Sequence, residues 1–184
     1  MAHHKVVSQE EWLTERRALL AKEREFDRLR DELSRTRRAL PWETVDKKHV
    51  FDSPRGTQTL ADLFGKCSQL VVYHFMFAPE WDAGCKHCSF WADNFNGIDV
   101  HLKHRDVSFV AISRAPLAKI EAFKKRMGWS FTWLSSSRTD FNYDYQASFQ
   151  PADVLAGGHQ LTTWKKHHLG CCRQMPVAGH KVAF

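Results

Sequence analysis

Two cysteines separated by two residues carry the clearest chemical signal in this sequence: Cys85 and Cys88, within Gly84-Cys85-Lys86-His87-Cys88. The pair follows an apolar run, 70–77, and precedes a helix-like run, 89–104. A strand that delivers two cysteines to the first turn of a helix places the leading sulfur beside unpaired backbone N–H groups, which stabilise a thiolate. We therefore predict that Cys85 is a nucleophile and that Cys88, one turn further along, resolves a mixed disulfide at Cys85.

The residues around the pair favour the same chemistry. Lys86 and a protonated His87 would both favour an anion at Cys85, so we expect an oxidising dithiol. Trp81, on the preceding loop, is a candidate platform for substrate. Asp82 is a candidate proton acceptor for Cys88.

Two other interpretations of the cysteine pair are possible: it could bind zinc, or it could have no chemical role. Zinc would need a second Cys or His pair, and the sequence has no second Cys-x-x-Cys. The remaining candidate ligands show no standard spacing: His87, His101, His104, His167, His168, Cys171, Cys172 and His180. We expect no metal and no other cofactor.

Composition limits the class of protein. The chain has 184 residues, 43% of them hydrophobic and 26% charged, as expected for one globular domain with an appendage. No run approaches the ~20 apolar residues of a membrane span. The N-terminal residues have no apolar signal core, so we expect a cytoplasmic protein, in which a structural disulfide framework is rare.

The net charge of +6 does not indicate a nucleic-acid partner. Four of these charges lie in residues 154–184, which contain no Asp or Glu: Lys165, Lys166, Arg173 and Lys181. No Lys/Arg stripe alternates with aromatic residues. The expected partners are a protein or small-molecule thiol or disulfide, with neither nucleic acid nor membrane.

Residues 8–40 are predicted to form a long helix. Ser8 and Glu11 make a capping-box signature, and no Gly or Pro interrupts before Pro41. The apolar stripe could pack on the chain's own domain or form a homodimeric coiled coil, with arginines beside the seam. Its residues recur every seven positions: Trp12, Leu19, Phe26, Leu33 and Leu40.

The rest of the chain alternates between strand and helix patterns. We predict strands at 45–51, 70–77, 107–112 and 130–135, helices at 57–64, 89–104 and 115–127, and a turn at 53–56. Such alternation implies parallel strands and an α/β sandwich of helix, sheet and helix layers. Reactive groups gather at the carboxyl ends of such strands, where Cys85 lies. His74, within the central strand, is predicted to be a core histidine.

Segments 68–77, 84–95 and 113–120 resemble the thioredoxin-like family of bacterial proteins of unknown function, often labelled predicted dithiol-disulfide oxidoreductases. The resemblance covers roughly residues 5 to 150. It implies a thioredoxin-like three-layer fold and redox activity at Cys85 and Cys88, and it supplies no substrate.

The C-terminal part departs from this family pattern. Thioredoxin relatives have a cis-proline before a late β-hairpin, whereas the only late prolines here, Pro151 and Pro176, precede no convincing strand. We therefore expect a divergent or incomplete C-terminal part. The predicted organisation is a helical arm (1–42), a thioredoxin-like domain (43–150) and a divergent tail that could be disordered (151–184).

A peroxidase is less favoured than a dithiol exchanger. Residues 50–64 look like the entry segment of peroxiredoxins, but Asp82 stands where their peroxide-binding Thr or Ser would be, and a carboxylate repels a thiolate. The sequence therefore predicts a thiol–disulfide oxidoreductase. The alternative is a non-enzymatic interaction or metal-binding protein on the same scaffold.

Overall fold

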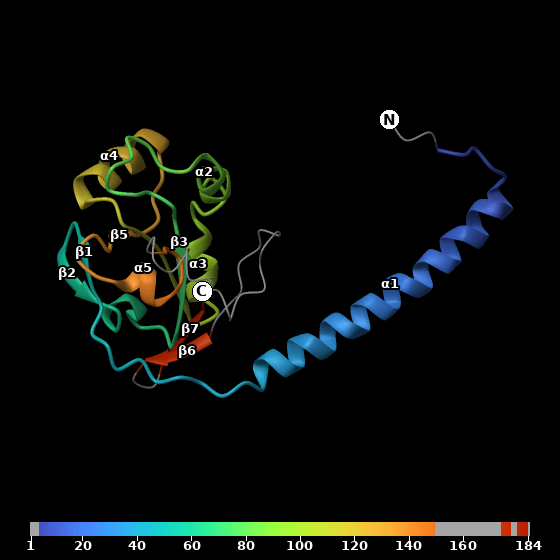
Figure 1. Ribbon diagram of the computed structural model, residues 1–184, viewed down its shortest axis with the longest axis horizontal. Helices are drawn as coiled ribbons and strands as arrows, with labels where there is room; N and C mark the ends of the chain where they lie inside the picture. The colour runs from blue at the N-terminus through green and yellow to red at the C-terminus, as the bar shows by residue number, and fades with distance from the viewer. Residues whose placement is uncertain (1–3, 150–173, 178–179, 184) are drawn as a thin grey trace. The chain divides into compact units, whose positions relative to one another are not determined.

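A helix of 30 residues, α1 (Gln9–Arg38), belongs to the first of two compact units in the computed structural model, Met1–Pro41 and Trp42–Phe184 (Figure 1). The structure describes residues 4–149, 174–177 and 180–183. As predicted, Ser8 caps α1, because its hydroxyl accepts a hydrogen bond from the Glu11 N–H at 3.2 Å. Acidic residues in the first turn and basic residues in the last complement the helix dipole.

One mixed sheet organises the second unit. Its described strands lie in the order β2-β1-β5-β4-β3-β7-β6. β3, β4 and β5 are parallel, β7 runs parallel to β3, and β1, β2 and β6 pair with their neighbours in antiparallel fashion. The strands are β1 (Val50–Ser53), β2 (Gly56–Thr59), β3 (Gln69–His74), β4 (Val107–Ser113), β5 (Trp133–Ser135), β6 (Gln174–Val177) and β7 (His180–Ala183).

Helices cover both faces of this sheet. On one face, α2 (Lys86–Ala92), α3 (Ile98–Lys103) and α4 (Leu117–Met127) pack over a cluster rich in aromatic side chains, which includes Phe75 and Trp133. On the other, η1 (Asp62–Phe64) and α5 (Phe141–Asp144) pack over a cluster that includes Leu70 and Val72. Burial from both sides explains why β3 and β4 are apolar almost without alternation.

Two predicted helices are wrong. Residues 57–64 form β2 and η1, because Gly56, with φ of 101°, closes a tight hairpin between β1 and β2. Residues 89–104 form two helices separated at 93–97, where Gly97 has φ of 79°. The break is a polar joint: the Asp93 carboxylate accepts from the Trp129 indole at 2.8 Å, and the Asn96 amide oxygen accepts from the Ser130 N–H at 2.9 Å.

The strands also differ from the prediction at both ends of the sheet. β1 begins at Val50, later than expected, and is antiparallel to β5, so the sheet is not purely parallel. The sequence suggested no strand after residue 135, whereas β6 and β7 form a hairpin beside β3. Pro176 lies within β6, which ends the strand order, where a residue without an N–H group is tolerated.

His74 is partly buried and packs against the core, in agreement with the prediction of a structural histidine. It ends β3 on the face opposite α2, and its ring stacks on Phe141 with centroids 5.3 Å apart. Nδ1 lies 3.5 Å from the Asn142 amide nitrogen. Burial lowers the pKa of His74 from 6.5 to about 4, so the ring is neutral at pH 7.

This lowered pKa predicts a loss of stability in acid. The folded protein binds its proton at His74 only near pH 4, whereas the unfolded chain binds it near pH 6.5, so protonation favours unfolding. Above pH 6.5, His74 should have little effect on the free energy of unfolding. As the pH falls from 6.5 to 4, protonation of His74 should lower that free energy by about 3 kcal/mol, and further acidification should change this contribution little.

Urea denaturation of wild type and His74→Phe at pH 6.5 and pH 4 measures this effect. The variant should lose less stability between the two pH values than wild type does. His49, whose pKa is also lowered by burial, contributes equally to both proteins. Equal losses in the two proteins would contradict the assignment.

Candidate dithiol site

Cys85 is the N-cap residue of α2, and Cys88 lies one turn inside the helix. The chain reaches this point from β3 through residues 75–84, and the Cys85 N–H donates to the Met76 carbonyl at 2.9 Å. Both thiols are free and half-buried. The structure therefore brings the two cysteines together at the carboxyl end of β3, in the strand-to-helix setting that the sequence predicted.

Hydrogen bonds connect the loop before Cys85 to β4, to α4 and to the residues between them. The Ser113 hydroxyl donates to the Phe75 carbonyl at 2.7 Å, and the Ala115 N–H donates to the Phe77 carbonyl at 2.8 Å. The Lys119 ammonium donates to the carbonyls of Pro79, at 2.8 Å, and Trp81, at 3.0 Å. These four contacts hold the backbone that presents the dithiol.

Gly84 allows the loop to pass close to the aromatic cluster. A Cβ atom at this position would lie 2.5 Å from Cε1 of Phe75 and 3.3 Å from Cε1 of Phe123. Only a hydrogen atom fits there. The residue before Cys85 is therefore fixed by packing, a constraint that the Cys-x-x-Cys motif does not contain.

The Cys88 sulfur faces the sheet. Burial raises the pKa of the Cys88 thiol, while the backbone N–H of Met76 and the phenol of Tyr73 act in the opposite direction by favouring the thiolate. The Cys85 thiol also contacts it, and its charge favours the neutral form of Cys88. Two sulfurs in contact can close a disulfide with little movement of the backbone.

Sequence reasoning missed Tyr73. Its hydroxyl lies 3.2 Å from the Cys88 carbonyl and reaches the Cys88 thiol as well. The alternation of side chains along β3 could have identified Tyr73, because it shares a face of the sheet with Val71 and Phe75. This is the face that α2 covers.

The other predicted site residues lie around the pair and are not among the groups that act on the ionisation of Cys88. Lys86 and His87 are exposed on the first turn of α2, and Trp81 is 38% exposed on the loop. Asp82 lines a cavity of about 230 Å³ against α4, together with Lys119 and Arg126. The roles of these four residues remain predictions. Among the described side chains, those that act on Cys88 are Tyr73 and Cys85.

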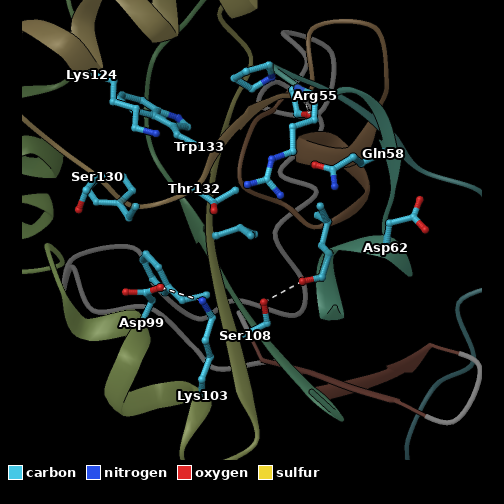
Figure 2. A pocket seen from close by; sticks show the side chains of 16 residues that line it. Arg55, Gln58, Asp62, Asp99, Lys103, Ser108, Lys124, Ser130, Thr132 and Trp133 are labelled. Atoms are coloured by element: carbon cyan, nitrogen blue, oxygen red, sulfur yellow. Dashed lines mark hydrogen bonds and ion pairs between the residues drawn. The ribbon is translucent and has the colours of Figure 1, made fainter. Parts of the chain in front are cut away.

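A larger cavity, of about 360 Å³, lies elsewhere, between the β1–β2 hairpin, α3 and the residues leading into β5 (Figure 2). Part of its polar lining is engaged internally: the Lys103 ammonium pairs with Asp99 at 2.9 Å, and the Ser108 hydroxyl donates to the Leu63 carbonyl at 2.8 Å. Neither motif cysteine lines this cavity. The dithiol is therefore presented at the surface rather than inside this cavity.

Within the described part of the chain, no three His, Cys, Asp or Glu side chains gather as a metal site would require. The candidate ligands His167, His168, Cys171 and Cys172 lie outside the described residues. The same described segments contain no helix that is both long enough and apolar enough to cross a membrane.

Residues 1–175 match the protein family described as "Bacterial protein of unknown function (DUF899)". The chain belongs to the DUF899 family. The match continues past residue 150, so the expectation that the family pattern stops there is wrong. For this DUF899 chain, comparison with curated proteins gives no match.

Among solved structures, the DUF899 chain is similar to the solution structure of a "putative protein disulfide isomerase" from Bacteroides thetaiotaomicron. The two share 24% sequence identity, with a TM-score of 0.35. The similarity covers 53% of this chain and 58% of the other, so the DUF899 chain spans less than two thirds of that protein.

The packing of Gly84 predicts the effect of a single added methyl group. In Gly84→Ala, the new Cβ would overlap the Phe75 ring and displace the loop, with an expected loss of about 1–3 kcal/mol in stability and a changed rate of Cys85 alkylation. Urea denaturation and alkylation with peptide mapping measure the two effects. In the double variant Gly84→Ala/Phe75→Leu, the smaller Leu side chain makes room for the new methyl group, and part of the Cys85 alkylation rate should return. A Gly84→Ala variant with the stability and alkylation rate of wild type would contradict the close packing of Gly84 on Phe75.

Proposed function

We propose that this DUF899 protein is a thiol–disulfide oxidoreductase of thioredoxin-like architecture, with Cys85 as the attacking thiol and Cys88 as the resolving thiol. The observation that supports this most is the contact of two free thiols across the first turn of α2, at the carboxyl end of a parallel strand. Both cysteine residues are half-buried rather than fully buried.

The proposed reaction consists of two exchanges. The Cys85 thiolate attacks one sulfur of a substrate disulfide; a bond forms between Cys85 and that sulfur, and the other substrate sulfur leaves as a thiolate. The Cys88 thiolate then attacks the Cys85 sulfur, the bond to substrate breaks, and the second substrate thiolate leaves and takes a proton from water. The substrate gains two electrons and the dithiol becomes a disulfide, and the reverse sequence oxidises a substrate dithiol.

The environments of the two sulfurs support this division of roles. Cys85 precedes α2, beside the N–H groups of the first turn and the exposed side chains of Lys86 and His87. Cys88 faces the sheet, and burial raises the pKa of its thiol. A thiol whose neutral form is favoured by burial suits the second exchange, in which it attacks only after the mixed disulfide has formed. Trp81, exposed beside the motif, offers an aromatic surface to the substrate chain.

Redox titration tests the proposal. The intact protein is equilibrated in glutathione buffers, alkylated, and mapped by mass spectrometry for the peptide that carries both motif cysteines. We expect a single two-electron couple that is lost in Cys85→Ser and Cys88→Ser and retained in Cys67→Ser, the matched control at a third cysteine. Cys88→Ser should also accumulate a stable mixed disulfide between Cys85 and glutathione, because nothing resolves it.

The absence of a defined couple in wild type would contradict the proposal. Stoichiometric zinc in the purified protein, lost in Cys85→Ser, would instead support a metal-binding protein.

A further inference from the structure

Tyr73 occupies a fixed position beneath the resolving cysteine. Its ring packs edge-on against Phe95, with centroids 5.0 Å apart, and against Phe75, at 6.0 Å. Both neighbours belong to the aromatic cluster under α2. The phenol therefore has its direction set by packing before any substrate arrives.

The hydroxyl of Tyr73 has two acceptors within reach on one residue. It donates to the Cys88 carbonyl at 3.2 Å, and it also reaches the Cys88 thiol. A phenol has one proton to donate, and its O–H can rotate between acceptors. A neutral thiol is a weak acceptor, so the carbonyl takes the hydrogen bond; a thiolate is a strong acceptor and would compete for it.

We propose that Tyr73 is a positioning residue for the resolving step, whose phenol donates its hydrogen bond to the Cys88 sulfur when that sulfur becomes a thiolate. This inference rests on the proposed function and deepens it, since it names the group that prepares Cys88 to attack the mixed disulfide. Among the described residues, the titratable groups that face the Cys88 sulfur are the Tyr73 phenol, from β3, and the Cys85 thiol, at the N-cap of α2.

Tyr73 acts here as a donor and not as a base. Burial raises the pKa of Tyr73 far above its usual value, and charge on Cys88 and Cys85 raises it further, so the phenol keeps its proton throughout the neutral range. The proton of the Cys88 thiol therefore passes to water. The Cys88 electron pair forms the bond to the Cys85 sulfur, and the departing substrate thiolate is protonated from water.

Removing the Tyr73 hydroxyl should change the ionisation of the Cys88 thiol. In Tyr73→Phe the ring and its contacts with Phe75 and Phe95 remain, but of the described donors to the half-buried Cys88 thiolate the Met76 N–H alone is left. Because a hydrogen bond to a charged group is among the stronger ones, we expect the population of Cys88 thiolate at neutral pH to fall about tenfold. The matched control is Tyr143→Phe, at a tyrosine that lies under Arg114 instead.

The first measurement does not require redox activity. In a Cys85→Ser background, the alkylation rate of Cys88 is followed against pH, with peptide mapping because the chain has five cysteines. Tyr73→Phe should raise the pKa of Cys88, and Tyr143→Phe should leave it unchanged. Global replacement of tyrosine by 3-fluorotyrosine, a stronger acid and so a better donor, should shift the Cys88 pKa in the opposite direction.

The second measurement follows the resolving step in the otherwise unmutated protein. Resolution of the glutathione mixed disulfide at Cys85 should be about tenfold slower in Tyr73→Phe at neutral pH and should recover in alkali, where Cys88 ionises without help. A Cys88 pKa and a resolution rate equal to wild type in Tyr73→Phe would overturn the assignment of Tyr73. A wild type without any redox couple would overturn the proposed function, while the pKa comparison would still decide whether Tyr73 donates to Cys88.

Discussion

The contact between Gly84 and the Phe75 ring is the constraint on which the dithiol site depends. Phe75 continues β3 by one hydrogen bond, from its N–H to the Ile112 carbonyl at 3.0 Å, so the ring is fixed by the sheet. Gly84 lies against that ring with no space for a side chain. The loop between these two residues is therefore held closed, and Cys85, the residue that follows Gly84, caps α2.

The alternation of β3 divides the chemistry of the molecule between two faces. Tyr73 points to the side of α2 and the cysteines, whereas His74, the next residue, points to the side of Phe141 and Asn142. Both side chains have pKa values displaced by burial, in directions that keep each one uncharged. The strand that supports the site thus carries polar groups on both faces without placing a charge inside either hydrophobic cluster.

The sequence allowed the strand–motif–helix unit to be predicted, because the apolar run, the Cys-x-x-Cys pair and the capped helices depend on local patterns. It did not reveal the break at 93–97, since that break is stabilised by Trp129 and Ser130, which are distant in sequence. The turn at 53–56 is predicted from its Pro and Gly, but the strand that follows it, β2, is predicted as part of a helix because four-residue strands leave little periodicity. The position of Tyr73 beside Cys88 could not be predicted for a related reason: it depends on which face of the sheet α2 covers, and tertiary packing decides that.

The polar joint between α2 and α3 has a mechanical consequence. Because α2 is only seven residues long and ends at Ala92, a displacement of Cys88 is transmitted for about one turn before it meets a break in the helical hydrogen bonding. The joint itself is anchored to residues 128–130 through Asp93 and Asn96, independently of the motif. Helix α2 can therefore adjust to the shorter sulfur–sulfur distance of a disulfide while α3 and the sheet beneath it stay in place.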